Sequence, residues 1–239
     1  MKKFSIIIVF QVFFLTGLLA QHIYVHKTDG TITTFNINSI DSITFSSLDY
    51  ILYEPFTGNI LNNEIWNIYN TTFYIEEGLN MYVNDTLIIY RGPNNDNNGH
   101  YGIVSKNQYS SVSEASVDVW LSSLHNWQDS KVEFITPIAR ISYYNLGARW
   151  FVEYTNSAGV NQTIDFANNY VPDSKYSLKI RIVGGSLKFE WDTGSGFVEV
   201  YSTTDFSTDY ICGYPDTYKR VMLSNSSKGY SKYDNLLLK

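Results

Sequence analysis

Residues 176–200 read YSLKIRIVGGSLKFEWDTGSGFVEV and decide the fold. Apolar and polar side chains alternate along 176–183 and again along 186–192, which is typical of β-strands with one buried face. Gly184 and Gly185 separate the two stretches and accept the positive φ angles of a tight hairpin turn. A second glycine turn at 194–196 leads into a third alternating stretch at 197–201. The segment therefore predicts three consecutive antiparallel strands.

The same pattern continues on both sides of this segment. Short alternating stretches are separated by Asn, Asp, Ser and Gly, and no amphipathic helix of convincing length occurs. Hydrophobic residues make up 44% of the chain and aromatic residues 16%, a balance that favours strands. We predict an all-β fold, a two-sheet antiparallel sandwich. The further candidate strands are 50–54, 73–76, 80–83, 86–91, 101–105, 113–121, 131–143, 148–154, 160–165, 221–224 and 233–238.

Charge and cysteine content exclude several classes of protein. The formal net charge is -6 and no block of Lys or Arg occurs, so we expect no nucleic-acid partner and no basic face for an anionic membrane. Cys212 is the only cysteine. An internal disulfide and a cysteine-based zinc site are therefore excluded.

The first 20 residues predict a cleavable secretory signal peptide. Lys2 and Lys3 supply the positive start, residues 6–19 the apolar region, and Ala20 the small residue before the cut. No second long apolar stretch follows, so we expect no transmembrane span after cleavage. The mature protein is expected outside the cell, on its surface or in the periplasm.

Residues 21–47 predict a small β-hairpin module ahead of the sandwich, which we assign to 48–239. Alternation before and after Asp29-Gly30 is the hairpin signal. The strings YVHKTDG (24–30) and IDSITF (40–45) resemble a segment that follows the signal peptide in secreted and surface proteins of Gram-negative gut and marine bacteria. This resemblance implies origin and export, and it carries no chemistry.

A second resemblance covers most of the mature chain. Phe56, the LNNEIW stretch (61–66), the strands of 176–200 and the ending YDNLLLK (233–239) resemble the concanavalin A-like lectin/glucanase superfamily, including its LamG-like members. It implies a jelly roll whose opening and final strands lie together. It also implies either glycan binding or glycan hydrolysis.

Hydrolysis of the retaining kind needs two carboxyl groups about 5–5.5 Å apart. Glu114 and Asp118 share one face of the 113–121 strand, but four residues of strand place them about 13 Å apart. That strand therefore lacks the carboxylate spacing of the superfamily's hydrolases, and we assign no catalytic residue. Pairing of Glu133 or Glu153 across strands stays open.

Glycan binding needs an aromatic ring for stacking and polar groups beside it. Trp120 and Asp118 alternate with apolar neighbours and are expected on the polar face of their strand. The alternative is that a loop covers Trp120. Trp127, in the loop after this strand, would line the same face or cap the core, and Arg149 and Glu153 on a later strand could add polar contacts.

No cofactor is predicted. The Asn-rich loop 94–98 leaves a structural calcium ion open, although one Asp among four Asn offers little charge. His22 and His26 share a face of the first hairpin, which is weak evidence for a metal. We rank a secreted or surface carbohydrate-binding or adhesion protein first. The alternatives are a glycan-degrading hydrolase or lyase and a structural or protein-interaction module.

Overall fold

The computed structural model describes residues 22–26, 32–36, 51–70, 79–91, 101–122, 131–144, 147–168, 170–211, 213–214, 217–226 and 229–239. The chain divides into two compact units, Met1–Leu48 and Asp49–Lys239. In the first unit, β1 (His22–His26) and β2 (Ile32–Asn36) pair antiparallel, with Ile23 opposite Phe35. The predicted signal peptide and the Asp29-Gly30 turn lie outside the described residues.

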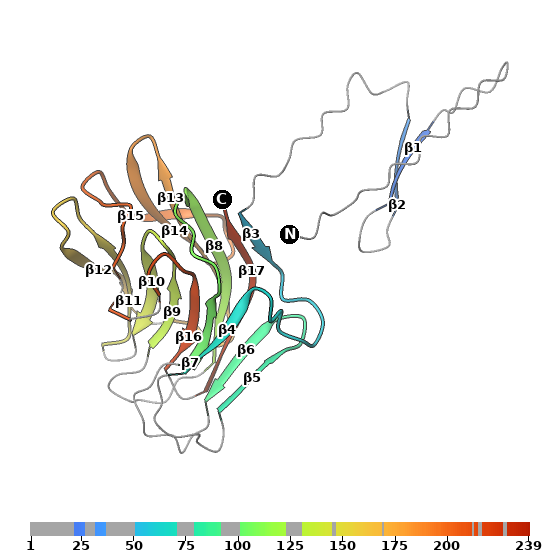
Figure 1. Ribbon diagram of the computed structural model, residues 1–239, viewed down its shortest axis with the longest axis horizontal. Helices are drawn as coiled ribbons and strands as arrows, with labels where there is room; N and C mark the ends of the chain where they lie inside the picture. The colour runs from blue at the N-terminus through green and yellow to red at the C-terminus, as the bar shows by residue number, and fades with distance from the viewer. Residues whose placement is uncertain are drawn as a thin grey trace. The chain divides into compact units, whose positions relative to one another are not determined.

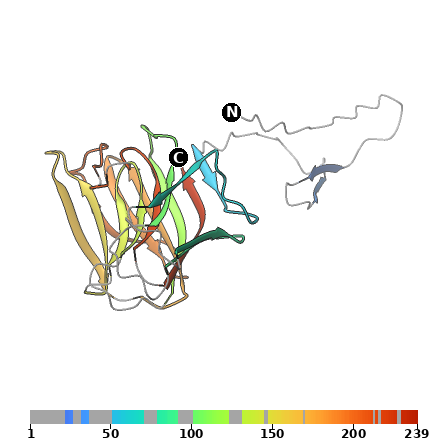
Figure 2. The same cartoon turned by 60° about the horizontal axis from the view of Figure 1, so that its bottom comes forward.

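The second unit is a sandwich of two antiparallel sheets, as Figures 1 and 2 show. The first sheet has seven strands. In spatial order they are β12 (Asn161–Asn168), β11 (Arg149–Thr155), β10 (Arg140–Tyr144), β9 (Lys131–Ile135), β16 (Met222–Asn225), β7 (Tyr101–Ser105) and β4 (Trp66–Asn70).

The second sheet has eight strands, of which seven lie side by side. In order they are β15 (Val198–Thr203), β14 (Ser186–Asp192), β13 (Lys175–Val183), β8 (Glu114–Leu121), β17 (Gly229–Leu238), β6 (Leu87–Arg91) and β5 (Leu79–Val83). The eighth, β3 (Leu52–Glu54), pairs with the end of β17. The opening and final strands of the sandwich therefore lie together, as the resemblance implied.

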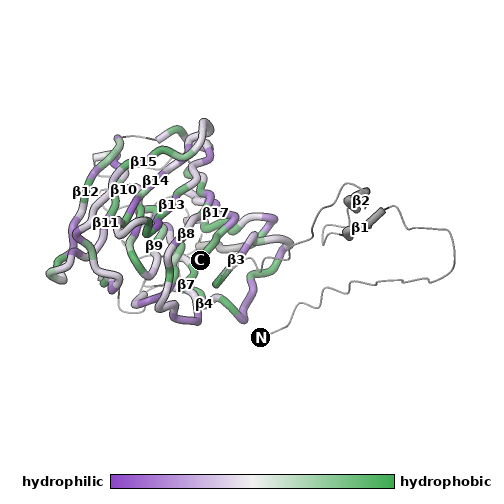
Figure 3. Tube along the Cα trace, turned by 90° about the horizontal axis from the view of Figure 1, so that it is seen from above, coloured by the Kyte–Doolittle hydropathy of each residue, from purple (hydrophilic) through white to green (hydrophobic). Residues whose placement is uncertain are grey.

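The core lies between the two sheets because the strands alternate in polarity, which the tube in Figure 3 displays. β8 shows the pattern most clearly: Ala115, Val117, Val119 and Leu121 are buried while the residues between them are half-exposed. On the other sheet, Trp150 is 1% exposed; its ring centroid lies 5.1 Å from that of Tyr176 and 5.4 Å from that of Tyr143. The predicted two-sheet antiparallel sandwich is confirmed.

The strand predicted at 131–143 is wrong in its extent, because the chain forms two strands there. Pro137 has no N–H and cannot continue a ladder of hydrogen bonds. Thr136 closes a tight turn instead: its backbone N–H and its hydroxyl both donate to the carbonyl of Ala139, at 2.9 and 2.7 Å. β9 and β10 consequently lie side by side as a hairpin. The strand β4 was not predicted, and the predicted strand 73–76 lies outside the described residues.

Candidate functional site

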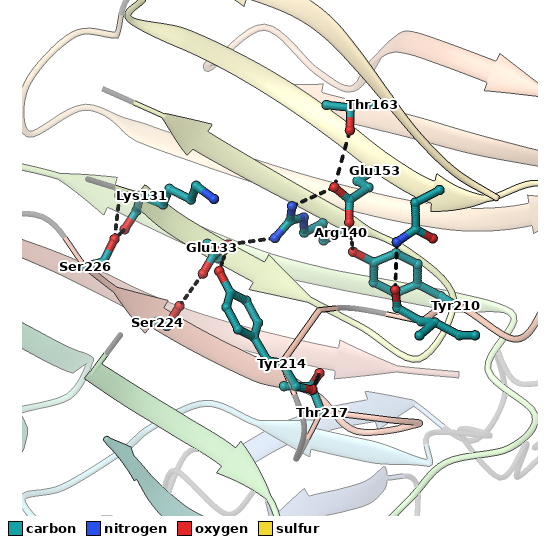
Figure 4. Close-up of polar contacts among 12 residues, drawn as sticks. Lys131, Glu133, Arg140, Glu153, Thr163, Tyr210, Tyr214, Thr217, Ser224 and Ser226 are labelled. Carbon is teal, nitrogen blue, oxygen red and sulfur yellow. Dashed lines mark hydrogen bonds and ion pairs between the residues drawn. The ribbon is translucent and has the colours of Figure 1, made fainter. Parts of the chain in front are cut away.

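Three charged side chains form a buried network on the outer face of the seven-stranded sheet (Figure 4). Glu133, Arg140 and Glu153 come from the adjacent strands β9, β10 and β11. Arg140 donates through Nη1 to Glu133 Oε1 at 2.9 Å and through Nη2 to Glu153 Oε2 at 2.6 Å. Their exposed fractions are 0%, 8% and 8% for Glu133, Arg140 and Glu153. Burial of this kind is tolerated only because the charges are paired.

Two tyrosines from the connection between β15 and β16 cover this network. The Tyr210 hydroxyl donates to Glu153 Oε1 at 2.6 Å, and the Tyr214 hydroxyl donates to Glu133 Oε1 at 3.1 Å. Ser224 on β16 adds a third donor to Glu133, at 3.0 Å. Beside the network, the tyrosines pack on an apolar cluster of the same sheet face that includes Tyr69, Val104, Ile135 and Met222. The connection is therefore fixed to the sheet by polar and apolar contacts together.

The arrangement of Glu133 and Glu153 differs from that of a glycosidase pair. A hydrolase needs one carboxylic acid and one carboxylate that both reach the sugar. Here one guanidinium lies between the two carboxylates and each carboxylate also accepts a tyrosine hydroxyl. The oxygen atoms of both carboxylates are therefore engaged in contacts within the protein. The network is suited to holding a chain segment in place.

Trp120 lies on the outer face of the other sheet. It is half-buried, and it belongs to the outward-facing set of β8 with Asp118 and Ser116. β8 lies between β13 and β17, so Trp120 has one directly opposed residue on each side, Lys175 and Lys232. Directly opposed side chains on one face have their Cβ atoms about 4.5–5.5 Å apart. The indole is thus flanked by two lysines.

Two tyrosines extend this face beyond Trp120. Tyr230 on β17 and Tyr90 on β6 are directly opposed, and both are half-buried. Their strand neighbours Ile89 and Ser231 are fully buried, so the tyrosines point outward. The Tyr230 hydroxyl donates to Asp173. Aromatic side chains on three adjacent strands therefore share one sheet face.

Asp118 lies on the opposite side of Trp120 from these tyrosines, and three donors hold its carboxylate. Ser177 donates to Oδ1 at 2.5 Å, while Asn235 Nδ2 and Lys175 Nζ lie 3.1 and 3.4 Å from Oδ2. Asn235 reaches Asp118 because β17 has a register irregularity there and Asn235 adopts a φ of 50°. Asn tolerates this left-handed conformation better than most residues. The Asp-Asn pair of the final strand thus has a definite structural role.

The five residues expected to bind ligand do not form one site. Asp118 and Trp120 lie on the outer face of the eight-stranded sheet, whereas Arg149 and Glu153 lie on the outer face of the seven-stranded sheet. Their strand neighbours Val119 and Val152 both belong to the core between the sheets. The two pairs therefore point away from the sandwich in opposite directions, and a site that combines them is ruled out. Trp127 lies outside the described residues.

Arg149 forms an exposed ion pair with Asp165, with Nη1 2.6 Å from Oδ2. Its guanidinium also lies over the ring of Tyr144, at 5.5 Å from the centroid. Glu153 is committed to Arg140 and Tyr210 and cannot offer a free carboxylate to a ligand. Of the predicted residues, Trp120 and Asp118 make the stronger candidate site.

Several residues of these faces escaped the sequence analysis. Lys175 and Lys232 flank Trp120 only through the register of β8 with its two neighbours, which no sequence pattern reveals. Arg140 could have been recognised from the sequence, because it is the one charged residue of an otherwise uncharged strand, and Glu133 and Glu153 lie among apolar residues on the strands before and after it. Opposite charges buried on adjacent strands indicate a cross-strand pair, but the prediction of 131–143 as one strand concealed the pairing of Glu133 with Arg140.

Within the described residues, no group of three or more His, Cys, Asp or Glu side chains could hold a metal ion. The Asn-rich loop 94–98 and the side chains of His22 and His26 are not among those residues. In the same part of the chain, no helix is long and apolar enough to cross a membrane.

The fold is that of the concanavalin A-like jelly roll, since solved structures of this type match most of the chain. A glycosyl hydrolase family protein from Mycobacterium fortuitum matches with a TM-score of 0.55 and 12% identity, over 80% of this chain and 100% of that one. A family 16 glycosyl hydrolase from Mycobacterium smegmatis matches with a TM-score of 0.54 and 13% identity, over 80% and 100%. β-Agarase A from Zobellia galactanivorans matches with a TM-score of 0.52 and 9% identity, over 78% and 89%.

At these identities the likeness shows the fold alone. No protein-family model matches the sequence, and no curated protein is significantly similar to it.

Proposed function

We propose that this protein is an exported, non-catalytic carbohydrate-binding protein whose ligand stacks on Trp120. The observation that carries the proposal is the position of this ring: a half-buried tryptophan on the outer face of a sheet, flanked by two lysines and close to two tyrosines. An indole face stacks on the C–H face of a sugar, and neighbouring polar groups fix its orientation. The concanavalin A-like fold and the predicted signal peptide agree with this function.

The non-catalytic part of the proposal rests on the network of Glu133, Arg140 and Glu153. This carboxylate pair is closed off by tyrosines and separated by a guanidinium. We therefore expect no release of reducing ends from any glycan that the protein binds. Release that a Glu133→Gln substitution abolished would contradict the proposal and favour the hydrolase alternative.

The binding site is tested with Trp120→Ala in the mature protein, by screening a glycan array and then titrating a bound glycan. Loss of a stacking ring is expected to cost about 1–3 kcal/mol, by analogy with stacking on nucleic-acid bases, which raises Kd between about fivefold and 150-fold. Tyr218→Ala is the matched control, because Tyr218 is 45% exposed and belongs to the connection that covers the opposite sheet.

A thermal melt distinguishes binding from packing. Trp120→Ala should melt close to the wild type, whereas truncation of a core tryptophan costs about 3–5 kcal/mol of stability. A large fall in Tm, or unchanged binding to an identified glycan, would show that Trp120 only packs against its neighbours.

A further inference from the structure

We infer that the glycan bound at Trp120 carries negatively charged substituents, either carboxylates or sulfate esters. This inference rests on the proposed function and specifies its ligand class. It comes from the two lysines beside the indole, Lys175 and Lys232, which the predicted binding residues did not include.

Most cations on the outer face of the eight-stranded sheet already have a carboxylate partner. Arg181 pairs with Glu190 at 2.5 Å, Lys188 with Glu199 at 2.7 Å and Lys239 with Glu114 at 3.3 Å. Lys232 has none among the residues that the structure describes, and its Nζ lies 4.9 Å from the centroid of the Tyr230 ring. Its ammonium is therefore available to an anionic group that approaches Trp120.

Lys175, on the other side of Trp120, is held weakly. Its Nζ lies 3.4 Å from Asp118 and its side chain is 51% exposed. Asp118 keeps two other donors, Ser177 and Asn235, when Lys175 moves away. A ligand anion can thus recruit Lys175 without leaving Asp118 unpaired. The ring, Lys232 and Lys175 together match a pyranose that carries a charge at its edge.

The acidic residues nearby restrict where this charge can lie. Asp118 and Asp234 oppose each other one step further along the strands, on the side of Trp120 away from Tyr230. Repulsion from them, and from Asp173 on the other side, whose carboxylate accepts the Tyr230 hydroxyl, confines the anionic substituent to the vicinity of Lys232. Because the chain has a net charge of -6, it attracts an anionic glycan only in the vicinity of these lysines. This attraction should weaken as added salt screens it.

The test uses pairs of polysaccharides that share a backbone and differ in charge: polygalacturonate against fully methyl-esterified homogalacturonan, and sulfated galactan against its desulfated form. We expect the charged member of a bound pair to bind at least about tenfold more tightly in low salt, a difference of about 1.4 kcal/mol. Added NaCl should reduce this preference. Lys232→Gln should bring the two affinities close together.

Lys179→Gln is the matched control. Lys179 also lies on this sheet face, four residues along β13 from Lys175, and its Nζ is 3.6 Å from the centroid of the Phe197 ring. It too lacks a carboxylate partner within the described residues, but it is distant from Trp120. Its loss should leave the preference for the charged polysaccharide unchanged.

The outcomes separate this inference from the proposed function. Equal binding of charged and neutral members, with both lost in Trp120→Ala, overturns the inference and leaves the proposed function standing. If Lys179→Gln and Lys232→Gln reduce the preference for the charged polysaccharide equally, the inference is also overturned. Diffuse surface charge would then be responsible for the preference. Absence of binding to every polysaccharide of the panel and of the glycan array overturns the proposed function itself.

Discussion

Asp118 and Asp234 occupy directly opposed positions on β8 and β17, with both side chains on the outer face of the sheet. Like charges in such positions are destabilising. Burial raises the pKa of Asp234 above its usual value, hydrogen bonding from the Asn235 backbone opposes this shift, and repulsion by Asp118 adds to it. This unfavourable pair lies beside Trp120 on the same sheet face.

The first prediction follows from the sign of this shift. A carboxyl group whose pKa is higher in the folded state than in the unfolded state stabilises the fold at low pH, and this contribution is lost as pH rises through the folded pKa. At pH 7 an ionised Asp234 therefore costs stability. Asp234→Asn should raise the free energy of unfolding at pH 7 by up to about 1 kcal/mol. Chemical denaturation should show a smaller gain at pH 3, which is below the ordinary aspartate pKa of about 3.9, because wild-type Asp234 is then protonated.

Asp192 provides the control in the same part of the sheet. Backbone hydrogen bonds from Gly194 and Gly196 help to lower the pKa of Asp192, so its ionised form is favoured. Asp192→Asn should consequently bring no gain at pH 7. An equal gain from Asp234→Asn at both pH values would show that repulsion from Asp118 is not the cause.

The second prediction concerns Arg140, which neutralises two buried carboxylates. Arg140→Ala should destabilise the fold by about 3–5 kcal/mol, because it leaves Glu133 and Glu153 buried without their cation. Arg149→Ala, which removes the exposed ion pair with Asp165, should cost no more than about 1 kcal/mol. Urea denaturation of both variants measures the contrast. Similar costs for the two would mean that water reaches the carboxylates and that the tyrosine cover is loose.

The β8 face could be predicted from sequence because alternation on a strand is a local property. Trp120 and Asp118 share a face whatever strands lie beside them. The partners of these residues could not be predicted, because Lys175 is 55 positions away in the chain and Lys232 is 112 away. Which residues oppose each other depends on register, and a shift of one residue would replace every neighbour.

The separation of Arg149 and Glu153 from Trp120 could not be predicted for a related reason. Each lies on the polar face of its strand, but alternation does not tell which of two sheets a strand joins. The separation of β9 from β10 was missed although Pro137 marks it. The apolar residues on both sides of Pro137 conceal the turn, since Ile138 and Ala139 are buried in the core like strand residues.

The third prediction concerns export. If residues 1–20 are a signal peptide, N-terminal sequencing of the protein recovered from the periplasm or medium should begin at Gln21. Replacement of Ala20 by a bulky residue should leave the precursor uncut, and the difference of about 2 kDa is measurable by mass spectrometry. Recovery of the full chain from the cytoplasm would contradict both export and the proposed extracellular function.

The last prediction concerns Gly102 on β7, which lies next to the edge strand β4 of the seven-stranded sheet. It lies on β7 opposite Ser224 of β16, and a Cβ atom at this position would meet the carbonyl oxygen of Leu223 at 2.0 Å and the Cα of Ser224 at 2.8 Å. Both contacts are with backbone, so no rotation of a side chain can relieve them. The β7–β16 pair would have to separate or slide.

Gly102→Ala should therefore destabilise the domain by about 1–3 kcal/mol, the usual cost of overpacking. Displacement of β16 would also move Ser224, which donates to Glu133, so the network beneath Tyr214 should loosen. Gly213→Ala is the control, because a Cβ atom there has no neighbour within 4 Å. Hydrogen exchange should show faster exchange of the β16 amides in Gly102→Ala alone, while exchange at Trp120 on the other sheet stays unchanged. Unaltered stability of this variant would mean that β7 and β16 are less closely paired than the register requires.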